Sequence, residues 1–66
     1  MIHNKRILIT GASRGLGAEA AHAFAELGAC LALVARSEDK LEQVRQSCKD
    51  PNRHVIIPID LLEMNA

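Results

Sequence analysis

Residues 6–17 have the sequence RILITGASRGLG, an apolar run that ends in a loop punctuated by glycines. The run from Arg6 to Thr10 favours β-structure and is not broken by alternating polar residues, which is typical of a strand covered on both faces. Gly11, Gly15 and Gly17 follow it, and an alanine-rich stretch comes next. These residues predict a strand, a glycine loop and a helix, in that order.

The stretch after the loop has the spacing of one helical face. Gly28 stands where the C-terminal cap of such a helix belongs. The apolar face predicted for this helix comprises Leu16, Ala20, Ala23, Phe24 and Leu27.

Two more strands and a second helix are predicted beyond Gly28. Residues 30–35 form a second uninterrupted apolar run, and the helix before it makes a parallel crossover the natural connection. Ser37 is suited to cap a helix with an inner stripe that ends at Cys48 and also includes Leu41 and Val44. Residues 54–59 supply the third strand, in which Pro58 indicates a broken ladder or an edge.

The predicted fold class is therefore α/β, with three parallel strands and two helices in the order βαβαβ. This is one Rossmann-type half of a doubly wound sheet. In the complete fold the first strand lies in the middle of the sheet, so the sheet expected here is incomplete and its apolar edge is open to pairing. We expect a fragment, a truncated gene product or a remnant.

Composition narrows the classes of partner. Eight basic and eight acidic side chains balance in the 66 residues, which gives no electrostatic reason to expect nucleic acid or an anionic membrane. No stretch is long enough to span a bilayer. Cys30 and Cys48 lack the spacing of a zinc site and are expected to be small buried or half-buried hydrophobes. A cytoplasmic protein is the default expectation.

The glycine loop is a candidate phosphate site. A loop between a strand and a helix offers closely approaching backbone and unpaired helical N–H groups, which suit the pyrophosphate of a dinucleotide. A Walker loop is excluded because no Gly-Lys-Ser/Thr follows the glycines. A methyltransferase also uses a glycine loop after its first strand, but it would normally carry an acidic residue where Arg36 stands.

Residues 10–17, TGASRGLG, resemble the cofactor loop of classical short-chain dehydrogenases/reductases. The resemblance extends over essentially the whole chain, through residues 27–29, 33–36 and 59–61, and makes residues 1–66 the N-terminal part of a single NAD(P)-binding domain. It implies that glycines 11, 15 and 17 surround the phosphates and adjoining ribose together with Ser13, Arg14 and Leu16. It also implies that Asp60 and Leu61 contact the adenine.

The residue at the end of the second strand predicts NADP rather than NAD. NAD-binding Rossmann proteins usually place a carboxylate there for the ribose hydroxyls, whereas this chain has Arg36. A guanidinium binds phosphate oxygens in pairs and stays ionised. Arg14 would approach the same 2′-phosphate from the glycine loop. The acidic Glu38, two residues beyond Arg36, argues against the prediction of NADP.

No catalytic residue is predicted in this chain. The resemblance assigns proton transfer to a Ser, a Tyr and a Lys, the last two in a Tyr-x-x-x-Lys arrangement, and the sequence contains no tyrosine. Lys5, Lys40 and Lys49 are expected away from the glycine loop. The three histidines, His3, His22 and His54, are expected at the surface. Neither Ser13 nor Ser47 has a histidine partner that the spacing suggests.

The leading hypothesis is an NADP-dependent oxidoreductase that transfers hydride between nicotinamide and a carbonyl or alcohol. Only its cofactor-binding segment is expected here, with the catalytic part absent, so a substrate would bind only in a full-length form. The alternatives are a non-catalytic nucleotide-binding fragment and a non-functional remnant, and whether the chain is an enzyme stays open. In the resembling family the oligomer interface is formed mainly by later helices, so none is expected in this chain.

Overall fold

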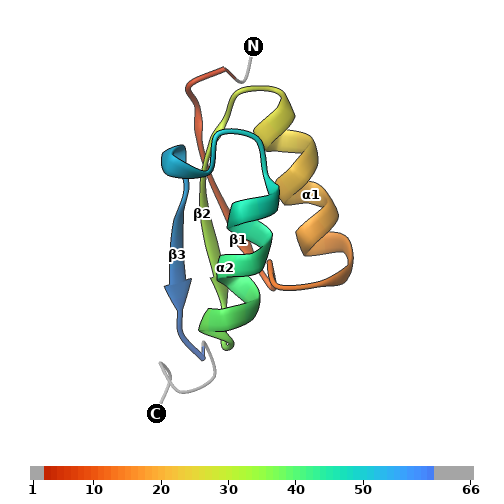
Figure 1. The fold of residues 1–66 in the computed structure, drawn as a ribbon, viewed down its shortest axis with the longest axis vertical. Helices are drawn as coiled ribbons and strands as arrows, with labels where there is room; N and C mark the ends of the chain where they lie inside the picture. Colours follow the sequence, from red (N-terminus) through yellow and green to blue (C-terminus); the bar gives the residue numbers. More distant parts are fainter. Residues whose placement is uncertain (1–2, 61–66) are drawn as a thin grey trace.

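A computed structural model describes residues 3–60, which form three strands, two α-helices and a short 3-10 helix (Figure 1). The predicted order of strands and helices is confirmed, although the third strand is shorter than the expected 54–59. The elements are β1 (Arg6–Thr10), α1 (Gly15–Glu26), β2 (Cys30–Ala35), α2 (Glu38–Ser47), η1 (Pro51–Arg53) and β3 (Val55–Pro58).

The three strands are parallel and lie in the order β1-β2-β3. Arg6 pairs with Cys30 at one end of the sheet, and Ala35 pairs with Pro58 at the other. Pro58 therefore lies on an edge strand, as predicted. Both helices pack on the same face of the sheet (Figure 1). The structure is thus the Rossmann-type βαβαβ half expected from the sequence.

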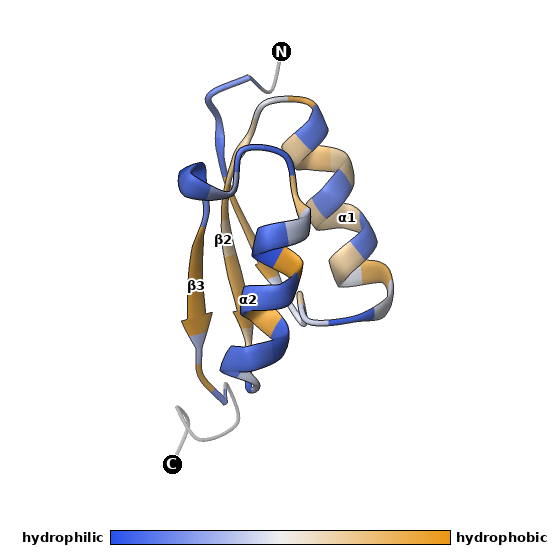
Figure 2. Cartoon of the chain, in the orientation of Figure 1, coloured by the Kyte–Doolittle hydropathy of each residue, from blue (hydrophilic) through white to orange (hydrophobic). Residues whose placement is uncertain are grey.

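Helix α2 follows its predicted pattern. Ser37 caps it, because the Lys40 backbone N–H donates to Ser37 Oγ at 3.3 Å. Leu41, Val44 and Cys48 are buried against the sheet, while the outer surface of the helix is hydrophilic (Figure 2). Burial of this stripe fixes α2 over β2 and β3.

Helix α1 follows the predicted face only in part: Ala20 and Phe24 pack against the core. Ala21 and Ala25 are buried, whereas Leu16 is 83% exposed and Leu27 is 60% exposed. Ala23 is also exposed. The prediction gave large side chains too much weight: alanines four positions apart share a face and allow a helix backbone to approach a sheet closely.

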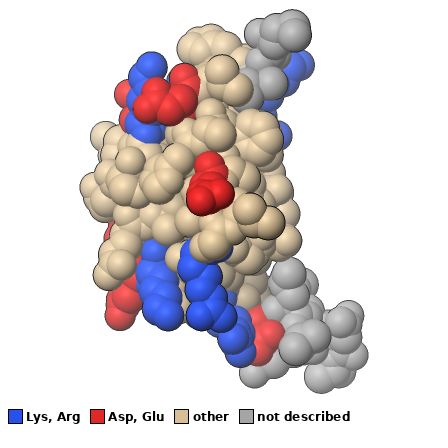
Figure 3. Space-filling model, turned by 90° about the vertical axis from the view of Figure 1, so that its right-hand side faces the viewer, with Lys and Arg blue, Asp and Glu red and all other residues tan. Residues whose placement is uncertain are grey.

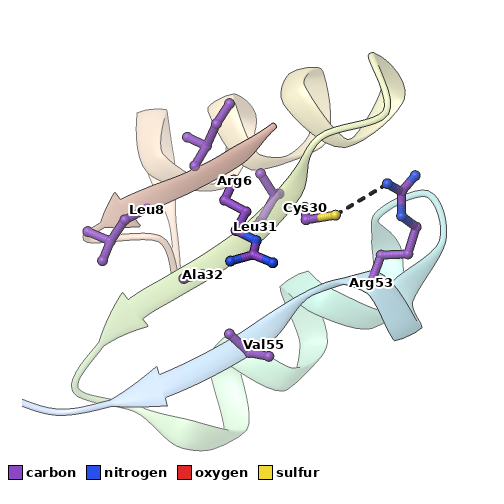
Figure 4. Close-up of a pocket in the computed structure, with 8 residues that line it drawn as sticks. Arg6, Leu8, Cys30, Leu31, Ala32, Arg53 and Val55 are labelled. Atoms are coloured by element: carbon purple, nitrogen blue, oxygen red, sulfur yellow. Dashed lines mark hydrogen bonds between the residues drawn. The ribbon is translucent and has the colours of Figure 1, made fainter. Parts of the chain in front are cut away.

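The face of the sheet opposite the helices is open in residues 3–60. Leu8 is 62% and Val55 is 58% exposed, although the strand sequences predicted cover on both faces. An apolar cavity of about 400 Å³ lies on this face, with Arg6 and Arg53 among its lining residues (Figure 4). On this face the outer strands β1 and β3 expose apolar side chains to solvent, whereas Val34 of the central strand β2 is buried.

His54 is buried rather than at the surface, which corrects the sequence prediction. Only 4% of it is exposed, and both ring nitrogens have partners. The backbone N–H of Leu31 donates to His54 Nδ1 at 3.1 Å, and His54 Nε2 lies 2.8 Å from the Lys49 carbonyl oxygen. This network assigns the ring proton to Nε2. The imidazole thereby ties β2 to the turn that follows α2.

Replacing His54 with leucine should destabilise the fold by about 2–4 kcal/mol, because the buried Leu31 N–H and the part-buried Lys49 carbonyl lose their partners. Thermal or urea unfolding measures the change. His22→Leu is the matched control, since His22 is exposed. Equal stability losses in the two variants would show that the buried imidazole has no special structural role.

Candidate functional site

The glycine loop turns the chain from the end of β1 into α1. Gly11 and Gly15 have φ angles of +64° and +61°, a backbone region that residues with a Cβ rarely adopt. The Ala12 backbone N–H donates to the Val34 carbonyl at 3.1 Å, which attaches the loop to the end of β2. The loop is therefore held at the carboxyl ends of two adjacent parallel strands, where open α/β sheets bind their ligands.

Gly17 makes the closest backbone approach in the loop. A Cβ at this position would lie 2.2 Å from the Gly11 carbonyl oxygen and 2.8 Å from its carbonyl carbon. The absence of a side chain thus lets the first turn of α1 rest on the end of β1. The N-cap residue Arg14 makes no side-chain cap hydrogen bond, and the first turn of α1 contains no acidic residue. This end of α1 keeps backbone N–H groups available for an anion.

Gly17→Ala should lower the free energy of unfolding by about 2 kcal/mol or more, since the added methyl group overlaps main-chain atoms. Glycine-to-alanine changes inside helices normally stabilise by about 1 kcal/mol. The expected sign is therefore the reverse of the helix-propensity effect. Urea unfolding checks it against Glu19→Ala, an exposed change in the same helix; a Gly17→Ala variant as stable as the parent would contradict the close packing.

A cavity of about 490 Å³ opens beside the loop at the carboxyl ends of the strands. It brings together Gly11, Ser13, Arg14, Arg36 and Asp60, all of which the sequence singled out. The lining comes from the glycine loop, the end of β2, the start of α2 and the segment after β3. Its residues are Gly11, Ser13, Arg14, Val34, Ala35, Arg36, Ser37, Lys40, Ile59 and Asp60.

The other predicted site residues have different placements. Gly15, Leu16 and Gly17 form the first turn of α1 and are not among the cavity-lining residues. The Leu16 side chain is exposed instead of contacting the core. Leu61 lies outside the described residues.

Two polar lining residues, Ser37 and Lys40, were not recognised as site residues from the sequence. Ser37 was identified only as a helix cap, and Lys40 was expected away from the glycine loop, which is wrong: both line the same cavity as Arg14. The crossover brings the first turn of α2 back beside the loop. The sequence signal that could have identified Lys40 as a site residue is its position four residues after Arg36. Basic side chains gather at the end of the molecule where the strands end (Figure 3).

The remaining titratable groups of residues 3–60 are not among the residues that line this cavity. Hydrogen bonds from Arg45 and Gln46 lower the pKa of Glu42, and burial raises the pKa of the Cys48 thiol, which favours its protonated, unreactive form. Cys48 is buried and Cys30 half-buried, as predicted. Residues 3–60 contain no cluster of three or more metal-ligating side chains and no helix long and apolar enough to cross a membrane.

His22 and Ser47 are neighbours, contrary to the expectation from spacing. His22 Nε2 lies 2.7 Å from Ser47 Oγ, on the exposed side of the two helices. Ser47 Oγ donates to the Val44 carbonyl at 2.8 Å, so its hydroxyl hydrogen is not directed at the imidazole. This pair joins α1 to α2 and does not have the hydrogen-bonding pattern of an activated nucleophile.

Comparison with known proteins finds a matching family and several similar chains. The family model described as short chain dehydrogenase matches residues 5–66. A dehydrogenase/reductase SDR family protein 7-like from Anopheles gambiae is 39% identical over 98% of this chain and 22% of its own length. The 11-beta-hydroxysteroid dehydrogenase 1A of Arabidopsis thaliana is 45% identical over 74% of this chain and 14% of its own length.

Solved structures agree in fold. A short chain dehydrogenase from Salmonella enterica serovar Typhi has a TM-score of 0.84 and 41% identity, over 92% of this chain and 26% of that one. Glucose dehydrogenase of Caenorhabditis elegans, in its apo form, has a TM-score of 0.83 and 28% identity, over 89% of this chain and 27% of that one. The chain therefore spans about a quarter or less of the length of these relatives.

Proposed function

Because the chain belongs to the short-chain dehydrogenase family, we propose that residues 1–66 are the cofactor-binding segment of an NADP-dependent oxidoreductase. Family membership implies a nicotinamide dinucleotide cofactor. The observation that carries the choice of NADP is the joint presence of Arg14 and Arg36 in the wall of one cavity beside the glycine loop.

The loop fits the phosphates of such a cofactor. Its positive-φ glycines expose main chain without a Cβ, and the first turn of α1 directs N–H groups and a partial positive charge toward the same region. Glycines 11, 15 and 17, Ser13 and Leu16 would surround the pyrophosphate and adjoining ribose, while Asp60 and Leu61 would contact the adenine. These assignments rest on the family motif and on the position of the loop.

The proposed partner of Arg36 is the 2′-phosphate, the group that distinguishes NADP from NAD. It is exposed, it immediately follows β2, and it shares the cavity with Arg14. A guanidinium binds a phosphate through paired hydrogen bonds, whereas a carboxylate at this position would repel it. Arg14 and Arg36 approach from separate elements and would hold the 2′-phosphate between them.

When bound, the nicotinamide would supply or accept the hydride for a carbonyl or alcohol substrate. The chain's own contribution is to bind and orient the dinucleotide, and the proposed proton-transfer groups would come from residues outside this sequence, which has no tyrosine. A cytoplasmic location and the substrate class stay predictions.

Nucleotide binding without catalysis is the second candidate function, and the absence of tyrosine favours it for the 66-residue chain alone.

NADP should raise the thermal unfolding temperature of the chain more than NAD does, because a ligand that binds only the folded state stabilises it. Arg36→Asp should weaken NADP binding by on the order of tenfold or more, since a charged hydrogen-bonding partner is lost and a like charge replaces it. Titration calorimetry gives the two affinities.

Arg6→Asp is the matched control for Arg36→Asp. It makes the same charge change on an exposed residue at the opposite end of the strands. NADP affinity should survive this change. A parent chain that binds neither nucleotide, or that binds both equally, would contradict the proposed NADP function.

A further inference from the structure

Lys40 is a third cation in the cavity that contains Arg14 and Arg36. It comes from the first turn of α2 and its side chain is exposed to the cavity solvent. The salt bridge between Arg45 and Glu42 involves none of these three cations. Three cations therefore share a wall that contributes one acidic residue, Asp60.

The position of Lys40 is not explained by helix stability. Ser37 is the N-cap and Lys40 is the third helical residue, where a capping box has Glu or Gln reaching back to the N-cap backbone. A lysine cannot accept that hydrogen bond, and its charge is unfavourable near the positive end of the helix dipole. Glu38 and Asp39 follow the dipole rule in the same turn, whereas Lys40 breaks it.

An ion pair along the helix does not account for Lys40 either. Residues three and four positions away on a helix are its side-chain neighbours. At Lys40 these positions hold Arg36, Ser37, Gln43 and Val44, none of which is acidic. The residue therefore departs from the local rules on three counts, and such departures concentrate at functional sites.

We propose that Lys40 is a specificity-determining residue that binds the 2′-phosphate of NADP together with Arg14 and Arg36. This inference rests on the proposed function. The three cations come from the glycine loop, the end of β2 and the first turn of α2, so a phosphate among them is approached from three elements. The arginines provide planar paired donors, and the lysine adds a compact charge with three donors.

Lys40→Gln separates ligand binding from folding. Glutamine at this position completes the capping box with Ser37, so the free protein should unfold at the same or a higher temperature. NADP affinity should fall by about three- to tenfold, the range expected for an exposed charged contact, while NAD affinity stays unchanged. The dependence of NADP binding on salt should also weaken. Calorimetric titrations with NADP and NAD at two salt concentrations, with thermal unfolding of the free protein, measure these effects.

Lys49→Gln and Lys40→Arg are the controls. Lys49 is an exposed lysine beyond the other end of α2, so its replacement should leave both affinities unchanged. Lys40→Arg keeps the charge and should retain NADP preference. If Lys40→Gln binds NADP like the parent while Arg36→Asp does not, the role of Lys40 is wrong and the proposed function stands. If Lys40→Gln weakens NADP and NAD equally, the residue acts on the fold or on a shared part of the cofactor. A parent with no preference for NADP overturns both proposals.

Discussion

The close approach of α1 to the end of β1 determines how the candidate site is built. Gly17 has no Cβ to separate it from the Gly11 carbonyl, so the loop between them is confined to a few residues at the sheet's carboxyl end. This places the amino end of α1 and Arg14 beside the end of β2. Parallel strand order then brings Arg36 and the start of α2 to the same place. One steric constraint in the main chain thus gathers side chains that are more than twenty residues apart in the sequence.

The strands, the helix order and most of the cavity were predictable because they follow from local rules. β1 and β2 match uninterrupted apolar runs, Ser37 caps α2 as its residue type suggests, and Gly28 takes a φ of +91° where a cap was expected. The cavity is predictable for a topological reason: residues immediately after parallel strands, such as Arg36 and Asp60, converge at one edge of the sheet.

The failures have a common physical origin in tertiary contacts that local patterns do not encode. Alanines 21 and 25 were overlooked because their value lies in how closely a helix approaches a sheet, which hydropathy does not measure. His54 was predicted to be exposed because its buried partner, a backbone N–H of β2, is distant in the sequence. Lys40 is distant from the glycine loop along the chain, but the crossover brings the start of α2 back beside that loop.

Pro58 makes the two margins of the sheet chemically unequal. The Ile59 N–H donates to the Ala35 carbonyl of β2. Successive backbone N–H positions in a strand point to opposite sides, so the backbone nitrogen of Pro58 points away from β2. The N–H that proline lacks is therefore not needed for pairing with β2. In β1 the same alternation turns the N–H groups of Arg6, Leu8 and Thr10 outward, and none of them is a proline. Any additional strand therefore finds a full set of donors beside β1 and an interrupted one beside β3. Pro58 alone therefore makes the addition of a further strand more favourable beside β1 than beside β3.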